Sequence, residues 1–307
     1  MARVLFGMID NNTRPIGGVK VIYQAVGGLR RRGIDAYVAS GVNMPEWLAG
    51  SRAIRDVKVV DMSKPQRLRP DDLYVATDAI GPHRMDFMLA RPERRVLFVQ
   101  NHNALPTNKA VDWSRLTHIR CLAVSEYSRR YLLEEVGFQE VDVVSPGVDL
   151  EVFKSAPERR HRIAYMPRKW PGAAARLQQH APQSVEWYPI EKATEQETAK
   201  ILGSSTVFLN LGRNEGFGLP PLEAMAAGCI VCGFAGEGTT DFATPENGFW
   251  APEGDMRACL RAIAGAVAAA EDPARAASFV AKGRETAERY SLAAFEDAME
   301  AYIRRVL

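Results

Sequence analysis

The pattern that decides the fold lies in STVFLNLGRNEGFGLPPLEAMAAGCIVCGF, residues 205–234. An apolar run at 205–212 leads through a glycine-bearing loop into a helical segment that opens with Pro220 and Pro221. A proline fits the first helical turn, because the N–H that it lacks would have no partner there. A second apolar run follows at 229–234. Strand, helix and strand in this order build parallel sheets that are covered by helices on both faces.

The same alternation continues through almost the whole chain. Near-continuous apolar runs, as parallel strands buried on both faces require, predict strands at 3–10, 35–40, 57–62, 72–79, 95–101, 121–126, 141–147, 162–167, 184–189, 205–212 and 229–234. Helices are predicted at 17–33, 125–137, 193–203, 219–228 and 255–271. The predicted fold class is therefore α/β, with two Rossmann-like doubly wound domains, one in each half of the chain.

The polar stretch 149–161 is the predicted boundary between these domains. It gives an N-terminal domain over 1–155 and a C-terminal domain over 156–290. The tail, 291–307, reads as a helix with an apolar face made of Phe295, Met299, Tyr302 and Val306. An apolar face at the end of the chain needs a cover, so we expect this helix to pack back on the first domain.

Composition excludes several classes of protein. The chain has 307 residues, 47% of them hydrophobic and 25% charged, and no apolar run approaches the roughly 20 residues that span a bilayer. The first residues lack the pattern of a signal peptide, so a cytosolic protein is expected. Cys229 and Cys232 form a CxxC within an apolar run, which indicates buried strand thiols better than a zinc site.

The charge is distributed unevenly along the chain. Residues 1–155 carry 22 Lys and Arg against 18 Asp and Glu, an excess too small to predict nucleic-acid binding. Part of the excess is the cluster Arg30, Arg31 and Arg32, and further arginines are scattered over 52–69. The cluster is either a solvated helix end or a weak, peripheral contact with an anionic membrane surface.

The loop between 212 and 218 is the candidate ligand site, since ligands of open α/β sheets bind beyond the carboxyl ends of the strands. Gly216 and Gly218 would let a ligand approach the backbone, and the following helix begins with a partial positive charge. Glu223 is predicted in the first helical turn, facing the same space as Glu215. A diphosphate at the helix end, with carboxylates binding sugar hydroxyls, explains both charges. Alternatively, Glu223 complements the helix dipole and Glu215 is solvated.

A family resemblance favours the first alternative. NEGFGLPPLEAMAAGCIVCGFAGEG, residues 214–238, closely resembles the Glu-x7-Glu motif of the family 4 glycosyltransferases, retaining enzymes of the GT-B fold. Residues 123–137, 141–153 and 15–33 are similar to further segments of that family. In the second of these, Ser145 and Pro146 stand before Gly147, where the family has an Asn. The resemblance implies two domains that face a central cleft.

The resemblance also implies roles for individual residues. Glu215 would contact the donor sugar near the reacting centre, and Glu223 would bind the ribose hydroxyls. His102, after an apolar strand, matches a histidine that often lies in the family's cleft, although a structural role stays open. Arg168 and Lys169 would neutralise the diphosphate, but they are adjacent here and separated in the family, so Arg168 is favoured. The remaining donor-binding residues implied are Gly17, Gly18, Gly216, Phe217, Gly218 and Leu219.

The function expected from this resemblance is transfer of a sugar from a nucleotide-diphosphate sugar to a hydroxyl acceptor, with retention and without a metal or other cofactor. Many relatives build bacterial surface polysaccharides or glycolipids, so a carbohydrate or lipid-linked acceptor at the inner face of the cytoplasmic membrane is expected. Acceptor recognition is expected in loops 41–55 and 101–112. A GT-B epimerase or phosphorylase remains an alternative, as does a non-catalytic sugar-nucleotide-binding protein. A dinucleotide oxidoreductase would need G-x-G-x-x-G after the first strand, which is missing.

Overall fold

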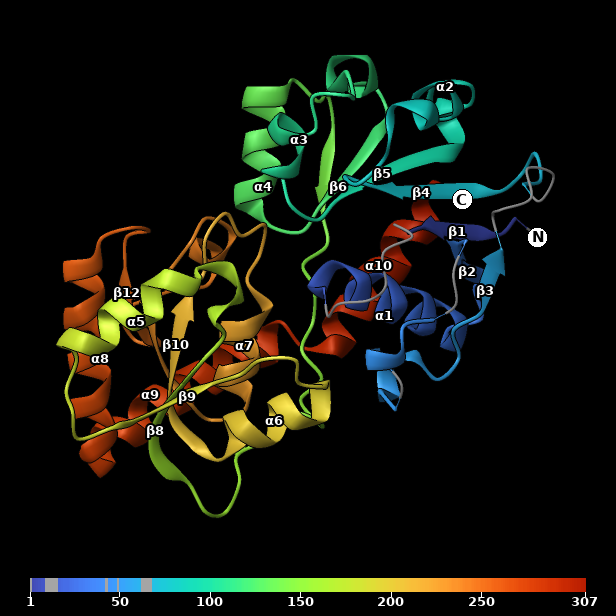
Figure 1. Ribbon diagram of the computed structural model, residues 1–307. Coiled ribbons are helices and arrows are strands. Elements are labelled where there is room, and N and C mark those ends of the chain that lie inside the picture. The colour runs from blue at the N-terminus through green and yellow to red at the C-terminus, as the bar shows by residue number, and fades with distance from the viewer. Residues whose placement is uncertain (1, 9–15, 42–43, 49, 62–67) are drawn as a thin grey trace. The chain divides into compact units, whose positions relative to one another are not determined.

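The computed structural model describes residues 2–8, 16–41, 44–48, 50–61 and 68–307 (Figure 1). The chain divides into two compact units. The first consists of Met1–Pro146 and Ala293–Leu307, and the second of Gly147–Leu292. The polar stretch 149–161, where the sequence places the domain boundary, thus belongs to the second unit. Residues 293–307 of the tail belong to the first unit.

Within its described residues, the first unit holds a seven-stranded parallel sheet in the order β3-β2-β1-β4-β5-β6-β7. Its strands are β1 Val4–Gly7, β2 Ala36–Ser40, β3 Val59–Asp61, β4 Leu73–Thr77, β5 Arg95–Val99, β6 Arg120–Ala123 and β7 Val141–Val143. All seven were predicted, although residues 9, 10 and 62 of the predicted runs lie outside the described residues. The helices are α1 Gly17–Arg31, α2 Met85–Leu89, α3 Ala104–Thr107, α4 Glu126–Tyr131 with the π-helical turn Leu132–Val136, and α10 Leu292–Val306.

The second unit contains a five-stranded parallel sheet, in the order β12-β11-β10-β8-β9. Its strands are β8 Arg160–Tyr165, β9 Glu186–Pro189, β10 Ser205–Leu211, β11 Ile230–Phe234 and β12 Gly248–Ala251. Its helices are α5 Pro171–His180, α6 Glu195–Gly203, α7 Leu219–Ala226, α8 Met256–Glu271 and α9 Pro273–Arg289. Helices α5 and α8 pack on the apolar face formed by residues such as Ile163, Val207 and Cys232. Two doubly wound α/β units are thereby confirmed, whereas the central cleft stays a prediction.

Strand order fixes where a ligand can bind in each unit. In the second unit the chain runs from β8 outward to β9, then crosses to the other side of β8 and continues through β10. The reversal between β8 and β10 is a topological switch point, where loops after adjacent strands diverge and leave room for a ligand. In the first unit the corresponding reversal lies between β1 and β4.

Helix α10 is held to α1 inside the first unit by charged side chains. The buried Glu296 carboxylate accepts a hydrogen bond from Arg31 at 2.5 Å and pairs with Arg32. Gly28 makes room for it, since a Cβ on Gly28 would lie 2.6 Å from Glu296 Cγ. Arg32 also binds Asp297 at 2.6 Å. All three members of the Arg30–Arg32 cluster therefore have carboxylate partners, since Arg30 lies 3.6 Å from Asp35, and they are not simply solvated.

The four cysteines are free and buried, which confirms the interpretation of Cys229 and Cys232 as buried thiols. Burial raises the pKa of Cys229 to about 12 and that of Cys232 well above its ordinary value. In the part of the chain that the structure describes, no cluster of His, Cys, Asp and Glu could hold a metal ion. None of the helices described there combines the length and the apolar character needed to cross a membrane.

Candidate functional site

The loop between β10 and α7 turns on Gly218. This residue caps α7 with φ 103°, in the left-handed region that favours glycine. A Cβ at Gly218 would lie 2.2 Å from Thr239 Oγ1, so the site has no room for a side chain. The Thr239 hydroxyl donates a hydrogen bond to the Phe217 carbonyl at 3.2 Å. The loop is thus packed tightly against the segment that follows β11.

Free backbone donors collect at the start of α7. The N–H groups of Phe217, Gly218 and Leu219 make no hydrogen bond within the described part of the chain. Phe217 and Gly218 are buried, and buried amides without partners are uncommon. Because Pro220 and Pro221 have no N–H, the donors belong to the loop and the first helical residue. Successive free amides at a positive helix end are an arrangement with which proteins commonly bind anions.

A small hollow at the switch point brings two predicted residues together. It is lined by Met166, Arg168, Phe208, Asn210, Leu211, Gly212, Glu215 and Pro220. Arg168 lies in the 3-10 turn Pro167–Lys169 after β8, and Glu215 lies in the loop after β10. A cation and a carboxylate thus line the same hollow where the strand order reverses. The side chain of Lys169 lies outside what the structure describes.

Glu223 does not occupy the first turn of its helix, so that prediction is wrong. Helix α7 begins at Leu219, directly after the left-handed Gly218, and no acidic residue lies in its first turn. Glu223 is the fifth residue of α7, on the same helical face as Leu219, and it is only 7% exposed. A role as a simple partner of the helix dipole is therefore less favoured, because that effect falls off within the first turn.

In the first unit, Gly17 and Gly18 open α1 beyond β1. The Gln100 side chain, directly after β5, donates a hydrogen bond to the Gly18 carbonyl at 3.0 Å. A Cβ at Gly18 would lie 2.2 Å from Gln100 Oε1, so this contact depends on glycine. Residues 9–15, which precede α1, lie outside the described residues. The two glycines thus lie at the end of β1, beside the β1–β4 switch point of the first unit, and their contact with a donor stays a prediction.

His102 is buried in a polar network. Its Nδ1 lies 2.9 Å from Ser128 Oγ, and its Nε2 lies 3.2 Å from Asn103 Nδ2. Ser125 donates a hydrogen bond to Ser128 Oγ at 2.9 Å, and the Tyr131 ring lies 4.8 Å from the imidazole. The histidine is 1% exposed. Because both ring nitrogens have protein partners, the geometry favours a structural role for His102 over a direct catalytic one.

Sequence reasoning missed Asp78, the first residue after β4. Its buried carboxylate accepts hydrogen bonds from the backbone N–H groups of Gln100 at 3.1 Å and Asn101 at 3.2 Å. Burial raises its pKa from 3.8 to about 6, and the two N–H groups oppose this shift. The folded state therefore binds this proton more tightly than the unfolded chain does, so the contribution of Asp78 to stability is fully present below pH 3.8 and is lost as the pH rises through about 6. The position of Asp78 directly after an apolar run is the sequence signal that could have identified it.

The loops expected to recognise an acceptor are described only in part. Residues 42, 43 and 49 of the 41–55 loop lie outside the described residues. The 101–112 loop contains the short helix α3, and it is anchored by Asn108, whose side chain donates a hydrogen bond to the Ile80 carbonyl at 3.0 Å. Nothing in either loop identifies an acceptor.

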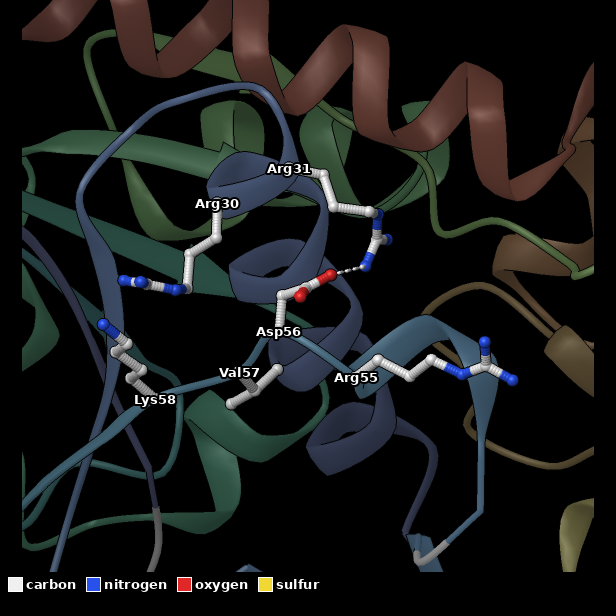
Figure 2. A pocket seen from close by; sticks show the side chains of 6 residues that line it. All are labelled: Arg30, Arg31, Arg55, Asp56, Val57 and Lys58. Carbon is white, nitrogen blue, oxygen red and sulfur yellow. Dashed lines mark ion pairs between the residues drawn. The ribbon is translucent and has the colours of Figure 1, made fainter.

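A basic pocket of about 420 Å³ lies at the end of α1 (Figure 2). Its lining residues are Arg30, Arg31, Arg55, Asp56, Val57 and Lys58. The pocket joins two members of the Arg30–Arg32 cluster, Arg30 and Arg31, to Arg55 and Lys58. Figure 2 shows the charged ends of Arg30 and Lys58 pointing toward one another, while Arg31 turns to Asp56 at 3.6 Å. Among the described residues, Arg55 and Lys58 find no carboxylate partner.

A family model described as "Glycosyl transferases group 1" matches residues 181–285 of this chain. This segment contains β10, α7 and the loop that carries Glu215. A curated relative, the alpha-1,6-glucosyltransferase of Actinobacillus pleuropneumoniae serotype 7, is 27% identical over 238 residues. That match covers 72% of this chain and 69% of the relative.

Solved structures of similar fold cover essentially the whole chain. Sucrose-phosphate synthase from Thermosynechococcus elongatus has a TM-score of 0.77 at 14% identity, covering 100% of this chain and 99% of its own. Anabaena HepE in complex with UDP and glucose has a TM-score of 0.74 at 14% identity, covering 99% and 100%. These likenesses confirm the predicted GT-B fold. Together with the family match and the relative, they support a GT-B glycosyltransferase.

Proposed function

We propose that the protein is a retaining glycosyltransferase of family 4, which moves a hexosyl group from a uridine-diphosphate sugar to a hydroxyl acceptor. The observation that carries the proposal is the presence of Arg168 and Glu215 in one hollow at the β8–β10 switch point, with the free amides of residues 217–219 following Glu215 in the chain. The HepE complex with UDP and glucose supports the donor class. The relative named as an alpha-1,6-glucosyltransferase supports retention, because an α-linkage made from an α-configured donor preserves the anomeric configuration.

The chemistry proposed for this site is departure of the diphosphate, on which negative charge grows as the anomeric bond breaks. Arg168 and the amides of Phe217, Gly218 and Leu219 would stabilise that charge, and Lys169 would assist. Preorganised donors of this kind are worth roughly 3–4 kcal/mol each. Glu215 is the sole carboxylate among the described residues that line the hollow. It would flank the cationic sugar, so a same-face substitution is favoured over a double displacement.

The proposal is tested by measuring binding and turnover in parallel. A thermal-shift series with UDP, GDP, ADP, CMP and dTDP, each with and without its sugar, should show the largest shift with a uridine nucleotide. Incubation with UDP-hexoses should then release UDP. We expect the release to continue in EDTA, because side chains and amides take the charge that a metal would otherwise carry. Restoration of lost activity by magnesium or manganese would overturn the metal-free proposal.

A non-catalytic protein that binds sugar nucleotides is the alternative. It would give a thermal shift with UDP-hexose but no UDP release with any acceptor. UDP release therefore distinguishes the enzyme from the alternative, because in the alternative the Glu215 carboxylate faces no reacting atom.

Replacing Glu223 by Ala should weaken donor binding by about 10- to 100-fold, the loss expected when a charged hydrogen bond to ribose is removed. Turnover at saturating donor should change much less, because this contact is present in the ground state and the transition state alike. Calorimetry with UDP and steady-state kinetics check both numbers. Glu285→Ala, which removes an exposed carboxylate from α9, is the matched control. Unchanged affinity with collapsed turnover would show that Glu223 acts on the reacting sugar.

We further propose that the acceptor is a lipid-linked carbohydrate of bacterial surface polysaccharide or glycolipid synthesis. The enzyme would work at the cytoplasmic face of the membrane, and the basic pocket of Figure 2 would make a weak contact with anionic lipid. The charged ends of Arg30 and Lys58 point toward one another there, while Arg31 is partly neutralised by Glu296 of α10. A cation near an anionic surface contributes about 1 kcal/mol, so a few give reversible binding only.

Binding to anionic vesicles should be lost when the pocket is reversed in charge. At low salt, we expect the wild type to sediment with phosphatidylglycerol vesicles and to release them at high salt, since salt screens such contacts. The double variant Arg55→Glu/Lys58→Glu should bind at least tenfold less. Arg176→Glu/Arg257→Glu, on α5 and α8, changes the net charge equally and should sediment like the wild type. Wild-type protein that ignores anionic vesicles at low salt would contradict the membrane proposal.

A further inference from the structure

The loop that carries Glu215 is held on one side by the segment after β11. The Gly238 N–H donates a hydrogen bond to the Glu215 carbonyl at 2.9 Å. The two backbones are so close that a Cβ on Gly238 would lie 2.0 Å from the Gly216 carbonyl oxygen. These contacts fix the backbone of Glu215 from its C-terminal side. These contacts do not involve the residues that directly precede Glu215.

On the other side, Glu253 holds the entering chain. This residue follows β12, and its side chain is 29% exposed. Its Oε2 accepts a hydrogen bond from the Asn214 N–H at 3.4 Å, and its Oε1 lies 3.8 Å from Arg213 Nε. One carboxylate therefore contacts the two residues that directly precede Glu215. The β12 strand lies two positions from β10 in the sheet, so this contact crosses over β11.

Arg213 has a second support in Trp170. The guanidinium carbon lies 4.9 Å from the centre of the indole, a cation–π contact. The indole is in turn stacked on Phe234, the last residue of β11, with ring centres 5.4 Å apart. Arg213 is thus held between an aromatic ring after β8 and a carboxylate after β12.

The backbone at Asn214 adopts an uncommon conformation, which contacts with neighbouring residues can stabilise. Asn214 has φ 50°, in the left-handed region that costs a non-glycine residue about 1–2 kcal/mol, although Asn tolerates it best. This turn comes directly before Glu215 and sets the direction in which its side chain leaves the loop. An uncommon conformation persists where its surroundings over-determine it. Glu253 contacts this turn through the Asn214 N–H and through Arg213.

We infer that Glu253 is a positioning residue for Glu215: it fixes the left-handed turn at Asn214, and with it the placement of the Glu215 carboxylate beside the reacting sugar. The inference rests on the proposed function, because it assigns Glu253 a task only if Glu215 acts there. Glu253 itself contacts no substrate in this scheme. It acts on the rate of the chemical step and leaves donor binding to Arg168 and the loop amides.

The experiment compares Glu253→Ala with Glu253→Gln in the full-length protein, using UDP-glucose as the donor. Misplacement of a catalytic group by about 1 Å costs on the order of 100-fold in rate. We expect Glu253→Ala to lower kcat by about 10- to 100-fold and to change the affinity for UDP less than about threefold. Glu253→Gln keeps an oxygen that can accept from Asn214, so it should recover most of kcat. Asn214→Gly in the Glu253→Ala background should also recover part of it, since glycine adopts the turn without strain.

The controls separate failure of this inference from failure of the proposed function. Glu285→Ala should behave as the wild type, and melting temperatures should show that every variant is folded. If Glu215→Gln is inactive but Glu253→Ala turns over normally, the positioning role is wrong and the proposed function stands. Equal losses in Glu253→Ala and Glu253→Gln, without recovery by Asn214→Gly, would also overturn it. If Glu215→Gln keeps wild-type turnover, the proposed function itself fails.

Discussion

Glu215→Gln should lower kcat by about 100- to 1,000-fold, while the affinity for UDP changes by less than about threefold. Glutamine has nearly the same shape and keeps hydrogen-bonding atoms, but it removes the negative charge that would face the developing cation on the sugar. That charge matters most in the transition state, so its loss should appear in kcat and not in ground-state binding. Steady-state kinetics with UDP-glucose and calorimetry with UDP measure the two effects separately.

Two comparisons decide how this result is interpreted. Glu285→Gln, on the exposed face of α9, should leave both constants unchanged. A Glu215→Gln variant that loses UDP affinity but turns over normally would show that Glu215 binds the nucleotide and not the reacting sugar. A variant with wild-type kcat and wild-type affinity would remove Glu215 from the mechanism altogether. Each outcome is distinct, because binding and turnover are measured on the same protein.

Much of the fold could be predicted because it follows from the local periodicity of apolar residues in the sequence. All eleven predicted strands exist, since runs such as 73–76 and 96–99 are apolar without interruption, as buried parallel strands must be. The one strand missed among the described residues, β12, has only four residues and follows polar turn residues. Helix α9 was missed because only Asp272 separates it from α8. Asp272 caps α9, and Pro273 is its first residue.

The candidate site was predictable only where one segment carries it. Glu215 and the loop after it lie within the 205–234 unit, so their placement at the carboxyl end of β10 follows from the strand–loop–helix order. The positions of the residues that hold this loop do not follow from that order. Glu253 lies 39 residues from Asn214 in sequence, and its contact depends on the strand order across β11. Asp78 likewise meets Gln100 and Asn101 only because β4 and β5 are neighbours in the sheet.

The second large effect that we expect is on stability. Asp72→Ala should lower the free energy of unfolding by about 3–5 kcal/mol, the cost of breaking a buried ion pair on one side. Asp72, just before β4, is 1% exposed and accepts two hydrogen bonds from Arg3, at 3.0 Å from Nε and 2.6 Å from Nη2. It also accepts the Arg69 N–H at 2.7 Å. Its removal leaves a buried guanidinium without its counter-charge, and a fall in melting temperature of roughly 10 °C is expected.

The neighbouring Asp71 is the matched control, because it is exposed and Asp71→Ala should shift the melting temperature by no more than about 1–2 °C. The pH dependence identifies charge as the cause. The Arg3 guanidinium holds the pKa of Asp72 below its usual 3.8, so the pair stabilises the folded state above that pH and the stabilisation is lost as the pH falls through the lower native pKa. The difference between wild type and Asp72→Asn should therefore be largest near neutral pH and shrink in acid. A difference that stays constant down to pH 2 would mean that packing, and not the ion pair, gives Asp72 its effect.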